Sequence, residues 1–446
     1  MLPCALRSSL TCDRRALVPD PDPNSTAASN PRQRILTMLT LIIAGEATFG
    51  LPFIVIRVFR PTLLDVFGIT NLQLGSAFAL YGLLAMAAYL PGGPLADRYS
   101  ARKLMTIALL GTAIGGVVYY QIPSAGTLTL LFGYWGITTI LLFWSPLIRA
   151  TRSWGGADAQ GRAFGILDGG RGLFAAVLGS ATVALFSALM PDDIANATLE
   201  ERAAALQAVI ATFTIFTVLA AALVWFILPD TSRQESGPRG STSEVWANVM
   251  KVARNRAVWL QMLIVLTAYC GYKALDDYSL YARDAFGFDD VQAAQVGTIA
   301  LWVRPVAPIV AGLIGDRVGV SRTVLVCFGI STFAFAAMGV GMAEFGLPTM
   351  LFLMVVSSAT VVFGLRGLYF ALFRAAKVEP ALTGTAAGII SVLGYTPDIF
   401  IGPLNGVLTD SYSGGAGHEY FYATVASFMA IGWLCAWLFQ REAARS

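Results

Sequence analysis

Charge, histidine and cysteine are all scarce in this sequence. Only 13% of the 446 residues are charged, and the chain holds one histidine, His418, and five cysteines. A soluble domain carries roughly 25% charged residues, so the low charge excludes that class. An odd number of cysteines, spread over a polar N-terminal segment and apolar runs, forms no disulfide framework. The single histidine excludes histidine-rich metal sites, so we expect any proton chemistry to fall to carboxylates.

Signatures of catalysis and of nucleic-acid binding are also missing. The sequence contains no HExxH, no GxSxG and no cluster of Cys and His, one of which a membrane-bound enzyme would need. The basic residues are scattered and form no stripe that could follow a phosphate backbone. We therefore expect a protein that is not an enzyme, needs no cofactor or metal and binds no nucleic acid.

Long apolar runs are abundant instead. Hydrophobic residues make up 56% of the chain, and its mean hydropathy is +0.66. A helix needs about 20 apolar residues to cross a bilayer. Twelve such runs occur, at 35–56, 73–96, 104–122, 127–149, 162–190, 205–228, 258–283, 292–315, 323–343, 348–370, 383–406 and 420–440. We predict an all-α membrane protein with twelve transmembrane helices, embedded in the lipid bilayer as a monomer.

Polar segments divide the chain into two halves. The longest polar interval, 229–256, predicts a cytoplasmic linker between a six-helix half at 34–228 and a second one at 257–440. Residues 1–33 are rich in Pro, Ser and Asn and lack the apolar core of a signal peptide. They predict a disordered cytoplasmic tail, or in part an upstream start. Residues 441–446 form a second short tail.

The basic residues indicate the orientation. Most of the 30 Lys and Arg lie in segments that share one side of the membrane, whereas acids such as Asp192 and Asp289 gather on the other. The positive-inside rule then places both termini in the cytoplasm, and we expect a bacterial inner (plasma) membrane. In this assignment Arg57 and Arg60 fall on the outer side.

Two charged turns repeat at half the chain length. They are Gly93-Pro94-Leu95-Ala96-Asp97-Arg98 and Gly312-Leu313-Ile314-Gly315-Asp316-Arg317, and each lies between two apolar runs. A second repeat pairs the segment from Ile148 to Arg152 with that from Phe373 to Lys377. Such repeats indicate a duplicated bundle. The Asp-Arg turns resemble the cytoplasmic loop signature of the major facilitator superfamily, which implies two pseudo-symmetric six-helix halves that transport by alternating access.

Charged residues inside the spans indicate a solute site. Each would cost about 2.5–3.5 kcal/mol at a lipid-facing helix centre, so we expect them to face the interior. Arg304 and Arg366 have no acid within four residues of them on their own helices, and Pro305 and Pro308 break the eighth helix beside Arg304. A guanidinium group can hold a carboxylate or phosphate through two hydrogen bonds. The substrate-binding candidates are Arg304, Arg366, Lys273, Arg171 and Tyr369.

The acids in the spans are candidates for proton coupling. Glu46 has no basic residue within a helical turn, so burial would favour its protonated form, and Asp168 and Asp398 are held in reserve. Alternatively, the pseudo-twofold relation places Glu46 near Lys273, where a permanent salt bridge would make it structural. Asp168 can likewise satisfy Arg171 on the same helix.

Charged residues at the predicted cytoplasmic helix ends suggest a gate. We expect acids and bases of neighbouring helices to pair when the protein is open to the outside and to separate when it opens inward. The gate candidates are Asp97, Arg98, Arg149, Arg152, Asp316, Arg317 and Arg374.

A narrower resemblance appears in the seventh and eleventh spans. The segment from Tyr272 to Tyr281 resembles the Y-G-x-L-D-W-x-P-x-Y stretch of the organophosphate:phosphate antiporters, and Gly384-Thr385-Ala386-Ala387-Gly388 with Gly394-Tyr395 matches their G-T-A-A-G…G-Y. This group includes the glycerol-phosphate and hexose-phosphate transporters. The positions of their two phosphate-clamping arginines hold Gly271 and a residue near Ile54. The resemblance therefore implies transport of a small anion, with protons or inorganic phosphate as coupling ion.

These patterns favour a secondary active transporter for a small organic anion, such as a sugar acid, carboxylate or phosphate ester. Two alternatives stay open. One is a multidrug or metabolite exporter of the same fold, although its G-x-x-x-G-P-x-x-G-G pattern is replaced by the segment from Leu167 to Gly172. The other is a transporter-like ligand sensor, which flux measurements in proteoliposomes would distinguish.

Overall fold

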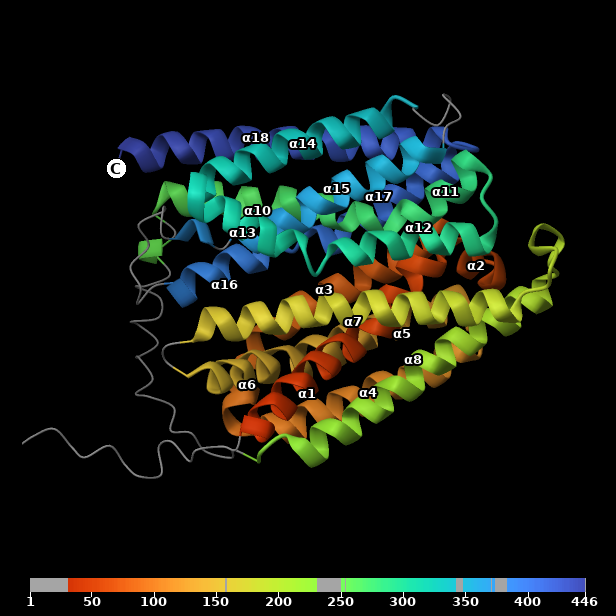
Figure 1. The fold of residues 1–446 in the computed structure, drawn as a ribbon, viewed down its shortest axis with the longest axis horizontal. Coiled ribbons are helices and arrows are strands. Elements are labelled where there is room, and N and C mark those ends of the chain that lie inside the picture. The colour runs from red at the N-terminus through yellow and green to blue at the C-terminus, as the bar shows by residue number, and fades with distance from the viewer. Residues whose placement is uncertain are drawn as a thin grey trace, which may run out of the picture.

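The structure, a computed structural model, is helical wherever it describes regular elements. It describes residues 31–156, 159–230, 250–252, 254–341, 348–369, 371–373 and 383–445. Within these ranges, eleven helical stretches are long and apolar enough to cross a membrane. The helices run roughly parallel to the long axis of the molecule in two stacked halves (Figure 1). The prediction of an all-α membrane bundle is confirmed.

The N-terminal half contains six spans, two of which change helix type midway. The first and fourth spans each include a π-helical segment, a form that often marks functional sites. In chain order the elements are α1 (Pro31–Phe49), η1 (Gly50–Ile54), α2 (Val55–Phe67), α3 (Asn71–Arg98), α4 (Ala101–Tyr120), α5 (Ala125–Gly136), η2 (Ile137–Trp144), α6 (Ser145–Gly155), α7 (Gln160–Leu189), η3 (Ile194–Asn196) and α8 (Leu199–Ile227).

The C-terminal half is broken more often. Arg304, Pro305 and Val306 form a turn between two helices, where the sequence predicts the proline break. The eleventh predicted span consists of two shorter helices, α16 and α17. The elements are α10 (Arg256–Ala274), η4 (Leu275–Asp277), α11 (Tyr278–Phe286), α12 (Asp290–Val303), α13 (Ala307–Val318), α14 (Val320–Gly339), α15 (Pro348–Leu368), η6 (Ala371–Phe373), α16 (Thr383–Gly394), α17 (Pro397–Ser411) and α18 (Ala416–Arg445).

Two predicted boundaries change. The first span does not end at residue 56 but continues through α2 to Phe67, past a kink at Phe59 and Pro61. Arg57 and Arg60 are therefore buried, at 3% and 2% exposure, and do not lie in an outer loop. Residues 31–33, predicted to belong to the tail, begin α1. The rest of that tail and linker residues 231–249 lie outside the described part of the chain.

Helix starts follow the polar residues before each apolar run. Thr70 and Gln73 form a capping box at the start of α3, as do Asp289 and Gln292 at α12. In each box two backbone N–H groups that lack helical partners are satisfied by side chains. These caps fix the turns at one end of the bundle, which the sequence predicts to be the outer end.

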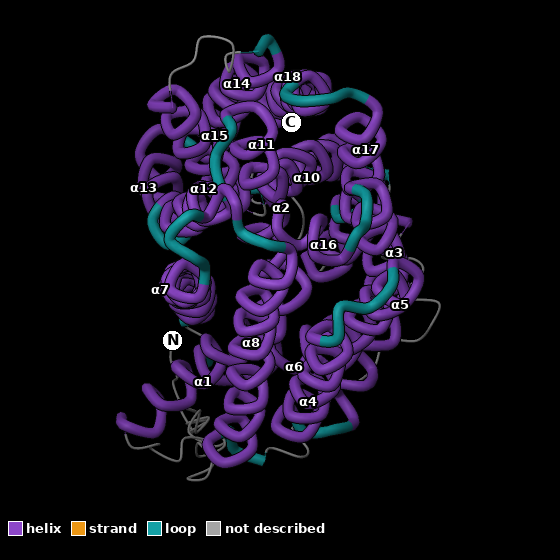
Figure 2. Tube along the Cα trace, turned by 90° about the vertical axis from the view of Figure 1, so that its right-hand side faces the viewer, coloured by secondary structure: helices purple, strands orange, loops and turns teal. Residues whose placement is uncertain are grey.

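Apolar cores form within each half and also across the two halves. One cluster of buried side chains lies entirely between residues 252 and 439. Another cluster, centred on α2, α3 and α8, also takes in Leu280, Val291 and Leu301 from the other half. Glycine allows the closest approaches, since a Cβ atom on Gly75 would clash with the carbonyl oxygen of Gly402. Viewed from the predicted outer end, α7 and α2 of one half lie against α12 of the other (Figure 2).

Candidate functional site

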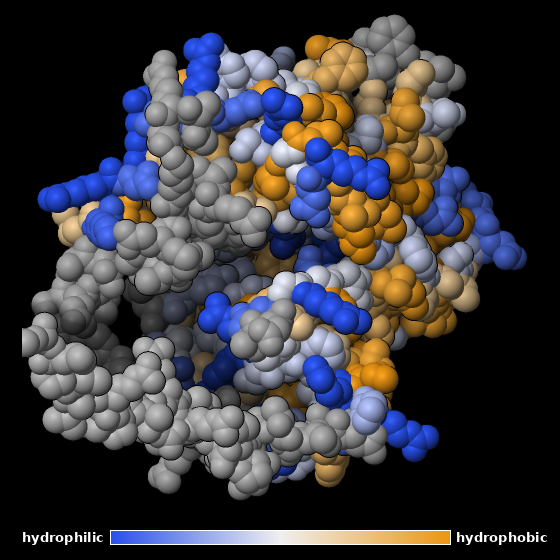
Figure 3. Space-filling view, turned by 60° about the vertical axis from the view of Figure 1, so that its left-hand side comes forward, coloured by the Kyte–Doolittle hydropathy of each residue, from blue (hydrophilic) through white to orange (hydrophobic). Residues whose placement is uncertain are grey.

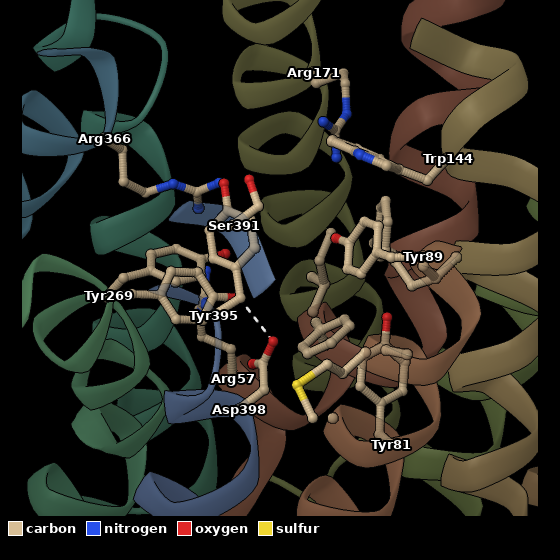
Figure 4. Close-up of a pocket in the computed structure, with 18 of the residues that line it drawn as sticks. Arg57, Tyr81, Tyr89, Trp144, Arg171, Tyr269, Arg366, Ser391, Tyr395 and Asp398 are labelled. Carbon is tan, nitrogen blue, oxygen red and sulfur yellow. Dashed lines mark hydrogen bonds between the residues drawn. The ribbon is translucent and has the colours of Figure 1, made fainter. Parts of the chain in front are cut away.

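A charged cavity lies between the two halves, near mid-depth. Its walls hold four arginines, Arg57, Arg171, Arg304 and Arg366, and two acids, Glu46 and Asp398. Much of the remaining lining is aromatic: Phe49, Phe53, Tyr81, Tyr89, Trp144, Tyr269, Tyr272 and Tyr395. The cavity holds about 1020 Å³ of empty space including its mouth. Figure 4 shows Arg366 and Arg171 reaching toward this space from different sides.

The cavity opens toward the predicted cytoplasmic end. A vestibule lined by Asp97, Arg149 and Arg152 shares Tyr89, Trp144, Ser391 and Tyr395 with the cavity wall. Turned so that this end comes forward, the molecule shows a hollow between the halves with hydrophilic residues inside (Figure 3). The described part of the chain is thus in an inward-open arrangement, if the predicted orientation is used.

The predicted outer end is closed by buried polar contacts between the halves. Arg57 Nε donates to Asp276 Oδ1 at 2.7 Å, and Arg60 Nη1 donates to the Asp276 carbonyl at 3.2 Å. Ser279 Oγ donates to the Arg57 carbonyl at 3.0 Å, and Thr62 Oγ1 to Asp290 Oδ1 at 2.8 Å. We refer to these five residues, Arg57, Arg60, Thr62, Asp276 and Ser279, with their partner Asp290, as the outer closure.

Glu46 pairs with two arginines on opposite sides of the interface. Arg304 Nη1 and Nη2 donate to its two carboxylate oxygens at 2.9 and 3.2 Å, and Arg171 Nε lies 3.3 Å from Oε2. Arg304 belongs to the C-terminal half, whereas Glu46 and Arg171 belong to the N-terminal half. The carboxylate therefore occupies the two-pronged face that a guanidinium group offers to an anion.

Arg366 has no acidic partner among the residues that the structure describes. Its guanidinium carbon lies 4.0 Å from the centre of the Tyr272 ring, and Arg57 lies 4.9 Å from the centre of the same ring. Such contacts contribute about 0.5–2 kcal/mol each but leave the N–H donors of the guanidinium group free to bind an anion. Within the described chain, Arg366 is thus a cavity cation whose charge is not neutralised by an ion pair.

Lys273 lies behind the cavity wall in a second ionic cluster. Its Nζ atom is 2.8 Å from Asp276 Oδ2 and 3.5 Å from Asp398 Oδ1. Tyr269 Oη donates to Asp398 Oδ2 at 3.1 Å, as the dashed line in Figure 4 shows. Asp398 therefore links the cavity surface to the outer closure through Lys273 and Asp276.

The alternative pairing of Glu46 with Lys273 is wrong. Glu46 forms ion pairs with Arg304 and Arg171, whereas Lys273 forms ion pairs with Asp276 and Asp398. The break after α12 brings Arg304 to Glu46, while the Lys273 ammonium packs over the rings of Phe53 and Phe78. The pseudo-twofold relation predicts only that Glu46 and Lys273 lie at a similar depth in the membrane. It does not predict the direction in which either side chain points.

The remaining predicted site residues lie near the cavity but outside its lining. Asp168 is 4.0 Å from Arg171, as expected within one helix, and its side chain is 56% exposed. Tyr369 is buried, and its hydroxyl lies 3.4 Å from the Tyr395 hydroxyl, which does line the cavity.

The predicted gate residues are apart in this arrangement. Asp97, Arg98, Asp316 and Arg317 are exposed, and Arg149 donates to the Tyr99 carbonyl at 2.8 Å. In the described ranges no ion pair joins these acids to Arg149 or Arg152. Arg374 lies outside the residues that the structure describes.

Sequence reasoning misses Arg57 and the tyrosines of the cavity. It places Arg57 on the outer side because the charged side chain interrupts the first apolar run. A signal is present nevertheless, since Arg57 and Arg60 are followed by the apolar stretch from Leu63 to Phe67. Among the tyrosines, Tyr272 and Tyr395 fall in the segments that resemble the antiporters. The others give no signal, because the same side chains also fill ordinary cores.

A helical bundle of two halves around a charged cavity that opens at one end is the architecture of a secondary transporter. The comparisons with known proteins agree. Residues 42–402 match the family model of the Major Facilitator Superfamily, and the chain belongs to this family. It is therefore a membrane transporter and not an enzyme.

Relatives along the whole chain are membrane proteins. Inner membrane protein YqcE of Escherichia coli (strain K12) is 24% identical over 415 residues, covering 92% of this chain and 95% of that protein. The probable nitrate/nitrite antiporter NarK1 of Thermus thermophilus is 26% identical over 406 residues, covering 86% and 87%.

Solved structures share the fold at low sequence identity. A bacterial homolog of the human lysosomal transporter Spinster, in an inward-facing and unoccupied conformation, matches with a TM-score of 0.70 at 16% identity, covering 93% of this chain and 98% of that one. A point mutant of the nucleoside transporter NupG matches with a TM-score of 0.71 at 13% identity, covering 92% and 99%.

Proposed function

We propose that the protein transports a small organic anion across the inner membrane by alternating access, with both termini in the cytoplasm. The observation that carries this proposal is Arg366, a cavity guanidinium without an acidic partner in the described chain. Arg304 and Arg171 lie in the same cavity and would become available if a ligand displaced Glu46. The relative NarK1, whose name assigns it an inorganic anion, supports the sign of the charge.

The lining supports an organic body on this anion. Tyr81, Tyr89, Tyr269, Tyr272 and Tyr395 present rings with hydroxyl groups, and Phe49, Phe53 and Trp144 add apolar surface. Aromatic walls with a few polar groups are typical of sites for small organic ligands. Sugar acids, carboxylates and phosphate esters fit this combination, and the last class corresponds to the organophosphate:phosphate antiporter resemblance.

In this proposal Glu46 is the residue that couples anion transport to proton movement. An anion on Arg304 would compete with the Glu46 carboxylate, and a released buried carboxylate favours protonation. Anion binding and proton uptake would then occur together. Asp398 and Asp168 are the next candidates. Exchange against inorganic phosphate is the alternative that needs no titrating group.

The experiment is a binding screen on the purified protein, followed by flux. We expect thermal stabilisation by at least one member of a panel of sugar acids, carboxylates and phosphate esters, and none by matched neutral sugars or lipophilic cations. Hydrogen bonds to charged groups contribute about 1.5–3 kcal/mol, so Arg366→Gln should weaken binding of the hit by about 10-fold to 150-fold.

Arg366→Lys separates charge from shape. Lysine keeps the positive charge but loses the planar fork, so we expect intermediate binding. Asp192→Asn, at the predicted outer end and exposed, is the matched control and should bind like wild type. Wild-type binding by Arg366→Gln would contradict the proposal, and binding without flux in proteoliposomes would indicate a sensor.

A further inference from the structure

The only histidine of the chain is buried between two carboxylates. His418, near the start of α18, is 1% exposed. Its Nδ1 atom is 2.7 Å from Asp277 Oδ2 and its Nε2 atom is 3.1 Å from Asp284 Oδ2. The Asp277 side chain is fully buried, whereas that of Asp284 is 27% exposed. We call Asp277, His418 and Asp284 the histidine triad.

These distances require a proton beyond those of a neutral ring and two carboxylates. A neutral imidazole has one N–H and can donate to only one of the two carboxylates. Either the ring is doubly protonated and donates to both, or one carboxyl group carries a proton and donates to the ring. In both cases the triad holds one additional exchangeable proton.

The triad connects the predicted outer surface to the outer closure. Asp284 accepts from Arg283 Nε at 2.9 Å, and Arg283 Nη1 reaches Asp65 of the other half at 2.9 Å. At its buried side the triad ends at Asp277, the neighbour of Asp276 in η4. Asp276 holds Arg57 through its carboxylate and Arg60 through its carbonyl. The imidazole therefore fixes the segment on which the closure depends.

Other charged or titratable groups face the triad, but none in the described chain contacts both of its carboxylates. The Tyr281 ring lies tilted against the His418 ring at 5.4 Å between ring centres, and Glu419 and Tyr422 follow on α18. From the N-terminal half, Arg60 lies within electrostatic reach of Asp277. On α17, Asn405 lies near Asp277, and Asp410 is bound to the backbone N–H groups of Asn71 and Leu72. Among the described residues, the imidazole alone bridges the buried and the exposed carboxylate.

We propose that the histidine triad is a proton-binding site reached from the predicted outer end, and that its proton keeps the outer closure shut. Loss of the proton leaves two carboxylates facing a neutral ring, with one hydrogen bond lost and like charges unscreened in a buried site. The contacts of α18 and α11 with η4 weaken, and the outward-open state gains population. The proposal concerns the transport fold and does not depend on the solute or on Glu46.

The single histidine makes proton binding directly observable. After selective isotope labelling and purification through a histidine-free tag, nuclear magnetic resonance shows one set of imidazole signals. We expect these signals to titrate with pH, with a midpoint that moves by about one pH unit in Asp284→Asn, because one charged neighbour is removed. An imidazole that does not titrate, or an unchanged midpoint in Asp284→Asn, would overturn the proton site.

The gate is tested through a cysteine at Ser279. This residue is fully buried between the halves at the outer closure, so a membrane-impermeant thiol reagent added outside should reach Ser279→Cys only when the outer end opens. The described native cysteines are buried. Linkage to one proton allows up to about tenfold change in the open population per pH unit. Because the thiolate is the reactive form and its fraction also rises with pH, the labelling rate is divided by that of Asp192→Cys, an exposed reference position at the same predicted end. We expect this corrected Ser279→Cys reactivity to rise with external pH in that proportion over part of the range above about pH 6, where a perturbed imidazole titrates.

Two triad variants and one control decide the outcome. His418→Gln and Asp284→Asn should flatten the pH dependence of the corrected labelling rate, and Asp284→Asn leaves the buried His418–Asp277 pair intact if His418→Gln fails to fold. Asp289→Asn, which keeps its capping role at α12 and does not touch the triad, should behave like the parent. The same pH profile in both triad variants as in the parent would refute the gate. Neither experiment uses a solute, so the anion proposal is tested separately.

Discussion

Four arginines in one cavity are costly unless something offsets their charge. A buried pair repays its desolvation only with good geometry and often adds little to stability. Here Glu46 offsets Arg304 and Arg171, and Asp276 offsets Arg57, while Arg366 is held over the Tyr272 ring. Because these charges are poor stabilisers, their cost is better explained by binding than by folding.

The exchange of Glu46 for a solute gives a test at the level of one residue. Glu46→Gln cannot ionise, so we expect it to abolish accumulation driven by a proton gradient, by at least about tenfold against wild type, while exchange of solute across the membrane persists. The measurement is uptake of the identified anion into proteoliposomes with and without an imposed gradient. Asp168→Asn serves as the comparison because its side chain is 56% exposed. Accumulation retained in Glu46→Gln but lost in Asp168→Asn would move the coupling role to Asp168.

Irregular segments contribute to the cavity alongside the helices α3, α7, α10 and α15. The π-helical segments η1 and η2 contribute Phe53, Ile54, Ile140 and Trp144 to the cavity lining, and the turn after α12 supplies Arg304. Non-helical or strained backbone at membrane depth is tolerated where it faces protein or a cavity. The regular helices α4, α8 and α14, all within the described chain, instead contribute no residue to that lining.

The contact of α12 with α2 predicts the effect of one added methyl group. A Cβ atom on Gly297 would lie 2.7 Å from the Arg57 carbonyl oxygen and 3.0 Å from Val58 Cα, both backbone atoms. Overpacking costs about 1–3 kcal/mol, so Gly297→Ala should increase the outward-open population about 5-fold to 150-fold. External labelling of Ser279→Cys measures this shift. Gly126→Ala, where a Cβ atom meets nothing within 4 Å, should leave labelling unchanged, and equal labelling in both variants would contradict the close contact.

At the scale of the whole molecule, one end is closed by buried contacts and the other is open. Alternating access requires the reverse arrangement as well, with the halves rocking around the cavity. Asp97, Arg149 and Arg152 face the open vestibule in this state. We propose that they meet partners from neighbouring helices when that end closes.

A latch of such pairs predicts the response to Asp97→Asn. Partly exposed ion pairs contribute about 0.2–1 kcal/mol each, so loss of one should shift the population toward the inward-open state by about 1.5-fold to 5-fold. Ser145→Cys, in the vestibule wall, reports this shift through its reactivity from the cytoplasmic side. Asp193→Asn, exposed at the opposite end, is the control. Unchanged Ser145→Cys reactivity in Asp97→Asn would count against the latch.

Local chemistry in the sequence indicated most of the spans and the break at Pro305, because each depends on residues that are neighbours in the chain, and motifs repeated at half the chain length indicated the duplication. It also indicated which charged side chains face the interior of the bundle, because a charge that faces lipid is costly. Pairs within one helix, such as Asp168 with Arg171, follow from sequence spacing, but only the tertiary structure decided the partners that lie far apart in the chain. Glu46 meets Arg304 across 258 positions and His418 meets Asp277 across 141, and no local pattern encodes such a meeting. Arg57 lines the cavity because α2 packs against α12 and holds this residue within the bundle. From the sequence alone, Arg57 is predicted to lie on the outer side of the membrane. Partner choice among buried charges depends on where packed helices aim their side chains, and that is a property of the assembled bundle.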